Sequence, residues 1–119
     1  MQNKNNMKKY EFTGETFVTP NATLKEIRAL CDFGDVKKGE IGGYIEAEYN
    51  LSHKGIAWVQ EQGMVWGSGR VEDQAILEDG KVYDSAMLCG GAIVRGGAEI
   101  SGMAIIEDDL IIDGGKITS

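Results

Sequence analysis

The sequence has little proline, histidine or cysteine and no long apolar run. Pro20 is the only proline, whereas glycine occurs 17 times. The glycines keep a fixed phase with aliphatic residues, which indicates tight corners and excludes a collagen-like or disordered chain. No segment approaches the roughly 20 apolar residues of a membrane-spanning helix, and the polar residues 1–9 are unlike a signal peptide. We therefore expect one cytoplasmic domain with Cys31 and Cys89 reduced and not joined in a disulfide.

Basic residues are fewer than acidic ones. Twelve Lys and Arg stand against 19 Asp and Glu, so the formal net charge is -7. Nucleic acids and anionic membranes bind proteins through an excess of Lys and Arg. We therefore expect neither as a direct partner. A basic protein surface, such as one that normally holds nucleic acid, is electrostatically easier to approach.

A small residue is followed two places later by a branched aliphatic residue again and again from Ala57 to Ile117. The pair occurs eleven times, with Leu110 once in the small position, and the steps are six residues except for two steps of five. Neither the 3.6-residue period of a helix nor the two-residue period of a lone strand fits. Short strands that turn a corner after each unit and stack as coils do fit. The pairs are Ala57/Val59, Gly63/Val65, Gly69/Val71, Ala75/Leu77, Gly80/Val82, Ala86/Leu88, Ala92/Val94, Ala98/Ile100, Ala104/Ile106, Leu110/Ile112 and Gly115/Ile117.

Three such units make one triangular coil. The pattern predicts an all-β fold: a short left-handed β-helix of the hexapeptide type, with three to four coils and an N-terminal β-rich cap. The small and aliphatic residues lie two apart on a strand, so both point inward. The two five-residue steps lie 35 residues apart, close to two coils, and are expected at the same corner of the prism.

The residue between the small and the aliphatic position points outward, and every third unit belongs to the same wall. A continuous apolar column is not expected to face water in a monomer. Two alternatives stay open for wall one: the N-terminal forty residues cover it, or it is a subunit or partner interface. Wall three can take the other role, and wall two is expected to face solvent. Wall one carries Trp58, Ile76, Ile93 and Ile111, wall two Met64, Lys81, Glu99 and Lys116, and wall three Arg70, Met87 and Ile105.

The N-terminal part divides into short segments. We expect a frayed tail over residues 1–7, a hairpin-like pair of strands around Gly14 over residues 8–19, and a turn after Pro20. Residues 23–31 fit a short helix or a strand, with the strand favoured, and residues 32–43 fit a loop with a Gly-Gly bend. The cap is thus residues 1–43 and the repeats are residues 44–119. Little chain remains after Ile117 to cover the last coil, which predicts a homodimer or homotrimer.

Catalytic groups are few. Acyl transfer on this kind of scaffold needs a general-base histidine beside a groove, and the only histidine, His53, fits a turn residue bonded to the local backbone. Cys89 has no basic neighbour in the sequence to activate it. Gly90-Gly91 and Gly96-Gly97 fit repeat corners and not phosphate loops, since no helix follows them. We expect no enzyme, no catalytic residue, no cofactor and no metal.

Acidic and aromatic residues gather at the predicted corners. Carboxylates at corners are usually solvated and keep a protein soluble, but here they also fit a ridge that binds a Lys/Arg-rich protein surface. Trp66 and Tyr83 are expected to stack at the remaining corner and to supply aromatic anchors for the same partner. The acidic ridge consists of Glu72, Asp73, Glu78, Asp79, Glu107, Asp108 and Asp109.

Several stretches resemble one family of phage and prophage proteins. These are Thr23-Leu-Lys-Glu-Ile-Arg-Ala-Leu, Asp32-Phe-Gly-Asp-Val-Lys-Lys-Gly, Gly42-Gly-Tyr-Ile-Glu, Asn50-Leu-Ser-His and Gly55-Ile-Ala-Trp-Val. The family continues from this block into hexapeptide-like repeats, and its members are often described only as transferases or polymer-forming proteins. The resemblance covers about residues 23–117 and implies a β-helix of phage-related origin. It carries no catalytic residue, and this chain is shorter than many members.

Three functions follow as hypotheses. The first is a non-enzymatic, phage-derived inhibitor of a host defence system, similar to an anti-CRISPR protein, which acts in the host cytoplasm by covering a basic surface of a host protein. The second is an oligomeric sponge for a signalling nucleotide. The third is a degenerate acyltransferase-like protein of the hexapeptide type.

Overall fold

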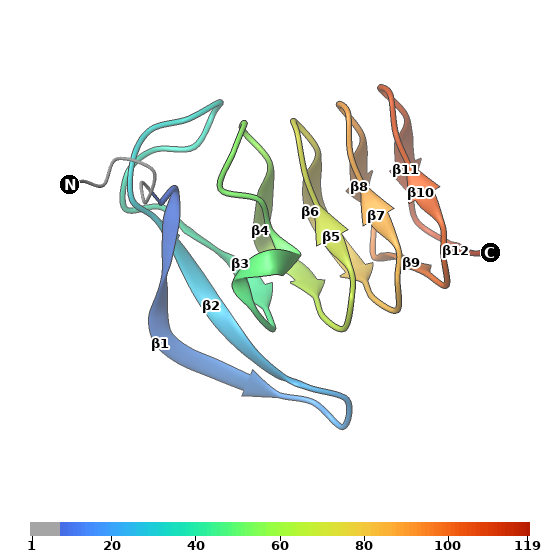
Figure 1. Ribbon diagram of the computed structural model, residues 1–119, viewed down its shortest axis with the longest axis horizontal. Coiled ribbons are helices and arrows are strands. Elements are labelled where there is room, and N and C mark those ends of the chain that lie inside the picture. Colours follow the sequence, from blue (N-terminus) through green and yellow to red (C-terminus); the bar gives the residue numbers. More distant parts are fainter. Residues whose placement is uncertain (1–7) are drawn as a thin grey trace.

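Short strands stack in parallel columns along most of the chain, and a two-stranded hairpin projects from one end (Figure 1). The computed structural model describes residues 8–119, so the tail expected over residues 1–7 lies outside the described residues. None of the helical segments in residues 8–119 has the length and apolar character to cross a bilayer. The strands are β1 Tyr10–Val18, β2 Thr23–Ala29, β3 Ile41–Ile45, β4 Trp58–Val65, β5 Arg70–Val71, β6 Ile76–Val82, β7 Met87–Leu88, β8 Ile93–Arg95, β9 Ala98–Ser101, β10 Ile105–Ile106, β11 Ile111–Asp113 and β12 Lys116–Thr118, with a 3-10 turn, η2, at Glu48–Asn50.

The parallel pairing confirms all three predicted walls. Wall one is a four-strand column in which Trp58 pairs with Ile76, Ile76 with Ile93 and Ile93 with Ile111. The other two columns follow the same rule. In wall two the register runs Met64, Lys81, Glu99, Lys116, and in wall three it runs Arg70, Met87, Ile105. The chain is therefore the expected short left-handed β-helix with an N-terminal β-rich cap.

The inward positions form the core, as the repeat predicts. From Ala57 to Ile106 every small and aliphatic residue of the repeat is buried. Both five-residue steps lie at the corner between walls one and two, which confirms the predicted coincidence. In the first coil this corner holds the longer six-residue step, and the register shifts between Val59 and Gln62.

The N-terminal part differs from the prediction in two places. Residues around Gly14 are not a hairpin: β1 is one strand, and Gly14, at φ 106°, lies in an irregularity of its pairing with β2. The turn expected after Pro20 is confirmed and joins β1 to β2, and the Thr19 amide donates to the Ala22 carbonyl there. Residues 23–29 form a strand and not a helix, as favoured.

The prediction of a Gly-Gly bend in a loop over residues 32–43 is also wrong. Gly42 and Gly43 lie in β3, which pairs antiparallel with β2 and parallel with β4. A Cβ atom on Gly43 would come within 2.3 Å of the Gln60 carbonyl oxygen. The glycines are therefore required by the close approach of β3 to the first coil and not by a bend.

The cap covers only the upper end of wall one. Trp58 is fully buried, and the rings of Phe33 and Tyr10 meet its indole edge-on at centroid distances of 5.3 and 6.4 Å. Further down the wall Ile76 is half-buried and Ile111 is 53% exposed. Of the two alternatives for wall one, covering by the N-terminal residues is correct at Trp58, whereas its lower end is open.

Candidate binding groove

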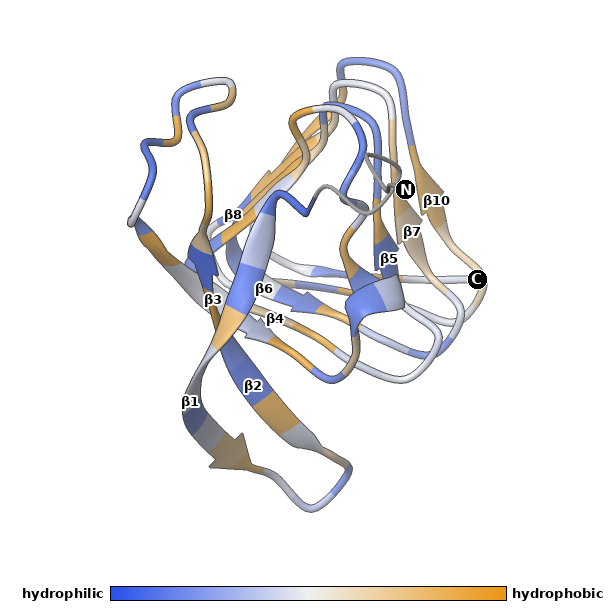
Figure 2. Ribbon diagram, turned by 60° about the vertical axis from the view of Figure 1, so that its left-hand side comes forward, coloured by the Kyte–Doolittle hydropathy of each residue, from blue (hydrophilic) through white to orange (hydrophobic). Residues whose placement is uncertain are grey.

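A groove separates the tip of the β1–β2 hairpin from wall two. The hairpin projects away from the stacked coils, with apolar residues at the end of β1 (Figure 2). The groove has a volume of about 420 Å³ and a mainly apolar lining. The hairpin contributes Phe17, Thr19, Pro20 and Asn21, and the coils contribute Met64, Trp66, Lys81, Tyr83 and Glu99.

Two aromatic rings form the floor of the groove at one corner of the prism. The rings of Trp66 and Tyr83 stack with centroids 4.7 Å apart and planes inclined by 1°, which places them as the sequence predicted. The Tyr83 hydroxyl donates a 3.0 Å hydrogen bond to the Glu99 carboxylate. The floor is therefore fixed both by ring stacking between coils and by a polar contact along wall two.

The hairpin side of the groove is also held in place. The Thr19 hydroxyl oxygen accepts hydrogen bonds from the amides of Asn21 and Ala22, and the hydroxyl donates to the Ala22 carbonyl. The Phe17 ring lies 6.0 Å from the Tyr44 ring of β3. These contacts give the hairpin tip one defined shape beside the aromatic floor. Wall two is thus not fully open to solvent as expected, because the hairpin overhangs it.

Asp73 of the acidic ridge and Asp84, which lies outside the ridge, support corners of the prism. Asp73 and Asp84 have φ angles of 60° and 57°, in the left-handed region. Their carboxylates accept 2.9 Å hydrogen bonds from the amides of Gly90 and Gly102 in the next coil. Short polar side chains tolerate this backbone conformation because they can bond locally. Asp73 therefore has a structural role that accounts for its position without a partner.

The remaining ridge residues differ in their exposure and in their contacts. Glu72 is paired with Arg70 at 3.0 Å, and Glu78 is half-buried while Asp79 is exposed. Asp108 lies beneath Gly90 and thus below Asp73, two coils apart as predicted. The exposed acidic residues of the last coil are Glu107, Asp108 and Asp109.

Apolar residues outside the groove are exposed mainly on the last coils. Ile105 of wall three is 53% exposed, and Met87 above it is half-buried. Leu110 and Ile111 are also about half exposed, at 52% and 53%. The structure thus leaves the lower parts of walls one and three uncovered, while Trp58 is no longer available as a contact residue.

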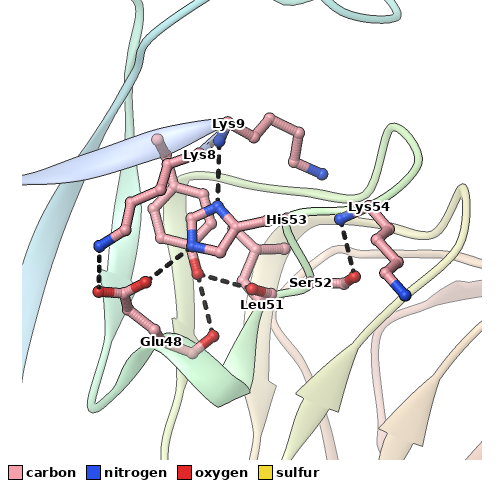
Figure 3. Close-up of polar contacts among 8 residues, drawn as sticks. Lys8, Lys9, Glu48, Leu51, Ser52, His53 and Lys54 are labelled. Atoms are coloured by element: carbon pink, nitrogen blue, oxygen red, sulfur yellow. Dashed lines mark hydrogen bonds and ion pairs between the residues drawn. The ribbon is translucent and has the colours of Figure 1, made fainter. Parts of the chain in front are cut away.

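His53 belongs to a cluster that fastens β1 to the first coil (Figure 3). Its Nδ1 accepts a 3.0 Å hydrogen bond from the Lys9 amide, and its Nε2 lies 2.8 Å from a Glu48 carboxylate oxygen. The ring also stacks on Tyr10 at 4.1 Å. The His53 bond, followed by that from Lys8, lowers the pKa of Glu48. With both ring nitrogens engaged, His53 offers no free base. It bonds to the backbone as expected, but the bond is to Lys9, 44 residues away, and not to the local backbone of its own turn.

Two further members of this cluster were not foreseen from the sequence. The Lys9 ammonium is buried, donates to the Ala57 carbonyl at 2.7 Å and lies 4.8 Å from the Phe33 ring centroid. Burial lowers the pKa of Lys9 to about 8. The Tyr10 hydroxyl donates to the Leu51 carbonyl at 2.6 Å, and burial, followed by the charge of Glu48, raises the pKa of Tyr10. A lysine before a strand carries no signal of burial, because lysines are usually exposed.

Asn50 is a third buried polar residue that sequence reasoning missed. Its side-chain oxygen accepts from the amides of Glu46 and Ala47, and its side-chain nitrogen donates to the carbonyls of Gly67 and Gly69. Both polar atoms of the Asn50 side chain are therefore hydrogen-bonded, and these bonds connect residues 46–47 to the corner at residues 67–69.

The acidic residues and thiols of residues 8–119 are spread along the chain. Among residues 8–119 no three His, Cys, Asp or Glu side chains are grouped so that they could hold a metal ion. Cys31 and Cys89 are free thiols. Burial, followed by the charge of Glu107, raises the pKa of Cys89, which opposes formation of a reactive thiolate.

Fold and repeat together define a short β-helix of the hexapeptide-repeat type, with a hairpin that creates a side groove. No family model matches the chain. The uncharacterized acetyltransferase YdcK of Escherichia coli (strain K12) is 37% identical over 51 residues, which is 43% of this chain and 16% of that protein. The matched stretch thus spans under a fifth of the relative's length. The similarity supports the hexapeptide-repeat β-helix, while the phage origin implied by the N-terminal block stays a prediction.

Proposed function

We propose that this chain is a non-catalytic binding protein that recognises a partner protein through the groove between the β1–β2 hairpin and wall two. The observation that carries the proposal is the apolar groove with the stacked Trp66 and Tyr83 rings on its floor. Aromatic residues in pockets are the commonest source of binding energy at protein interfaces. Both sides of the groove are held by hydrogen bonds within the chain, so little ordering is needed on binding.

The charges near the groove favour an apolar mode of recognition. Lys81 and Glu99 both line it and are neighbours in the wall two register, so their charges offset each other. The acidic ridge offers a weaker basis for binding, because Asp73 is bonded to Gly90 and Glu72 to Arg70. The partner that we propose is therefore held by the groove. The acidic ridge at most raises the rate at which a basic partner associates at low salt.

The proposal is tested by comparing which host proteins the wild-type chain and three variants retain. Trp66→Ala removes the floor of the groove, Ile111→Ser alters the open end of wall one, and Ile105→Ser alters wall three. A specific partner should be retained by the wild type, Ile111→Ser and Ile105→Ser, and lost by Trp66→Ala. Retention by Trp66→Ala together with loss on either isoleucine variant would move the interface to that wall.

A second candidate is acetyl transfer, which the name of the E. coli relative favours. In this chain His53 is bonded at both nitrogens, which argues against its use as a base. Incubation with acetyl-CoA and amine acceptors discriminates the two functions. Release of CoA that His53→Ala abolishes would establish the enzyme and remove the binding proposal.

The identity of the host target is a further part of the proposal. A phage-derived inhibitor of a defence effector fits the N-terminal block. A complex with candidate effectors that requires Trp66 would support this target, whereas melting temperatures raised by cyclic nucleotides would support the nucleotide sponge instead. Oligomer formation, as a dimer or trimer, is tested by measuring the mass in solution.

A further inference from the structure

We infer that the groove binds a proline-rich segment in the polyproline II conformation. The inference rests on the proposed function and names the class of partner segment that the groove can hold. It depends on three properties of the groove: its size, the hydrogen-bonding state of its walls and the chemistry of its lining.

The size of the groove suits a short, narrow segment. The groove holds about 420 Å³. A single polyproline II turn of three residues is about 9 Å long and has no internal hydrogen bonds to preserve. An extended segment of this kind therefore fits between the hairpin tip and the wall.

The walls of the groove do not offer main-chain partners to an added strand. The residues of wall two that face the groove, Met64, Lys81 and Glu99, stand in one continuous parallel ladder. Their outer side chains, not a strand edge, form the surface of the groove. A β-strand in the groove would lose hydrogen bonds of its own backbone. The backbone of a polyproline II segment stays hydrated, so it does not incur this cost.

The free edge of β1 is a poor alternative site for an added strand. β1 is the terminal strand of its sheet, and its pairing is irregular around Gly14. Glu11 and Glu15 lie on either side of this irregularity, and both are exposed. Bulges and charged residues on an edge strand are the usual protection against strand addition.

The lining matches proline rings. Trp66 and Tyr83, stacked on each other, provide the aromatic floor, and Phe17 and Pro20 form the opposite side. Grooves lined by aromatic residues are the common recognition sites of proline-rich segments. Because Lys81 and Glu99 offset each other, the groove selects no strongly charged segment. We expect the proline rings to provide most of the affinity, and the binding to depend little on salt.

The test uses a synthetic proline-rich decapeptide and Trp66 as its own reporter. Trp58 is fully buried, so the Trp58→Phe background leaves Trp66 as the only tryptophan, and binding is followed by its fluorescence. We expect saturable binding that weakens about tenfold or more in Tyr83→Ser and Phe17→Ser. The control variant is Ile105→Ser, which alters wall three and should leave the affinity unchanged. An alanine-substituted decapeptide, which lacks the polyproline II preference, should bind about tenfold more weakly or not at all.

Two results would overturn the inference, and they are distinguishable from failure of the proposed function. If the proline-rich and alanine peptides bind equally, or neither binds while a host protein still requires Trp66, the groove is a binding site for another class of segment. If neither peptide binds and no host protein requires Trp66, both the inference and the proposed function are wrong. Circular dichroism of each variant shows whether it is folded, and a variant that is unfolded is replaced by Tyr83→Leu or Phe17→Leu, both of which keep Trp66 as the reporter.

Discussion

The ammonium group of Lys9 donates a 2.7 Å hydrogen bond to the carbonyl of Ala57, 48 residues further along the chain. This bond joins the start of β1 to the first repeat of the β-helix. It lies in the same cluster as His53, whose Nδ1 accepts the Lys9 amide. The cap that supplies the hairpin side of the groove is thus fixed to the coils by buried polar contacts as well as by the packing around Trp58.

The buried Lys9 predicts an unusual dependence of stability on pH. Its pKa is about 8 in the folded chain, against 10.5 for an ordinary lysine, so the unfolded chain binds more protons between these values. The contribution of Lys9 to the free energy of unfolding should therefore rise by about 1–3 kcal/mol from about pH 8 to pH 10, while the raised pKa of Cys89 acts against this rise above pH 9.0, the ordinary pKa of a thiol. Above about pH 10 the free energy of unfolding should fall, because the raised pKa of Tyr10 makes the folded chain retain a proton that the unfolded chain releases.

Urea unfolding at a series of pH values measures this dependence. Lys9→Met should remove the rise, whereas Lys54→Met, at an exposed position, should keep it. An identical rise in Lys9→Met would show that another group is responsible.

Trp58 should be the more important of the two tryptophans for stability. It is fully buried beneath Phe33 and Tyr10, so Trp58→Ala should lower the free energy of unfolding by about 3–5 kcal/mol. Trp66 is half-buried beside the groove, and Trp66→Ala should cost less than about 2 kcal/mol. Denaturant unfolding of both variants is the measurement, with Trp58→Phe used if the alanine variant does not fold. Equal losses for the two alanine variants would mean that the cap does not cover wall one.

The register of the coils was predictable from the sequence because the period of six is independent of its surroundings. The column Trp58, Ile76, Ile93, Ile111 follows from counting every third unit and is observed. The stacking of Trp66 on Tyr83 follows from the same count. Local patterns in a repeat specify which side chains are neighbours, because each coil contacts only the next.

The cap and the groove could not be predicted in this way. The burial of Lys9 and the position of Phe17 beside Tyr44 depend on how a non-repeating hairpin meets the coils. The sequence predicted a bend at Gly43. The group that requires a glycine there is the Gln60 carbonyl in β4, which belongs to a different segment of the chain. Contacts between distant segments leave no periodic signal in the sequence.

Asp73 should stabilise its corner through both backbone and side chain. Asp73→Ala places at φ 60° an alanine, whose side chain cannot form the local hydrogen bonds that make this backbone conformation tolerable, and it removes the bond from the Gly90 amide. The free energy of unfolding should therefore fall by about 1–2 kcal/mol. Asp73→Gly removes the bond but relieves the backbone, so the loss should be smaller. The control is Asp79→Ala, at an exposed position of the ridge, which should change stability by less than about 0.5 kcal/mol. Thermal or urea unfolding of the three variants is sufficient, and a larger loss for Asp79→Ala than for Asp73→Ala would contradict the structural role.

The acidic residues of the last coil should contribute little to partner binding. A combined variant with Glu107→Gln, Asp108→Asn and Asp109→Asn removes three exposed negative charges. Asn tolerates the left-handed backbone of residue 108, so the fold should persist. The affinity for a groove partner should be unchanged at high salt, as measured by calorimetry at two salt concentrations. If this variant no longer forms the complex, the acidic ridge and not the groove is the binding surface.

The most direct test of the account is a nuclear magnetic resonance titration of the isotope-labelled chain with the proline-rich decapeptide and, separately, with acetyl-CoA. The indole N–H signals of Trp66 and Trp58 report the groove and the covered wall within one spectrum. We predict that the peptide shifts the signals of Trp66, Tyr83 and Phe17 and leaves Trp58 and His53 unchanged, and that acetyl-CoA shifts none of them. Shifts caused by acetyl-CoA around His53, or peptide shifts confined to residues outside the groove, would contradict recognition through the aromatic groove.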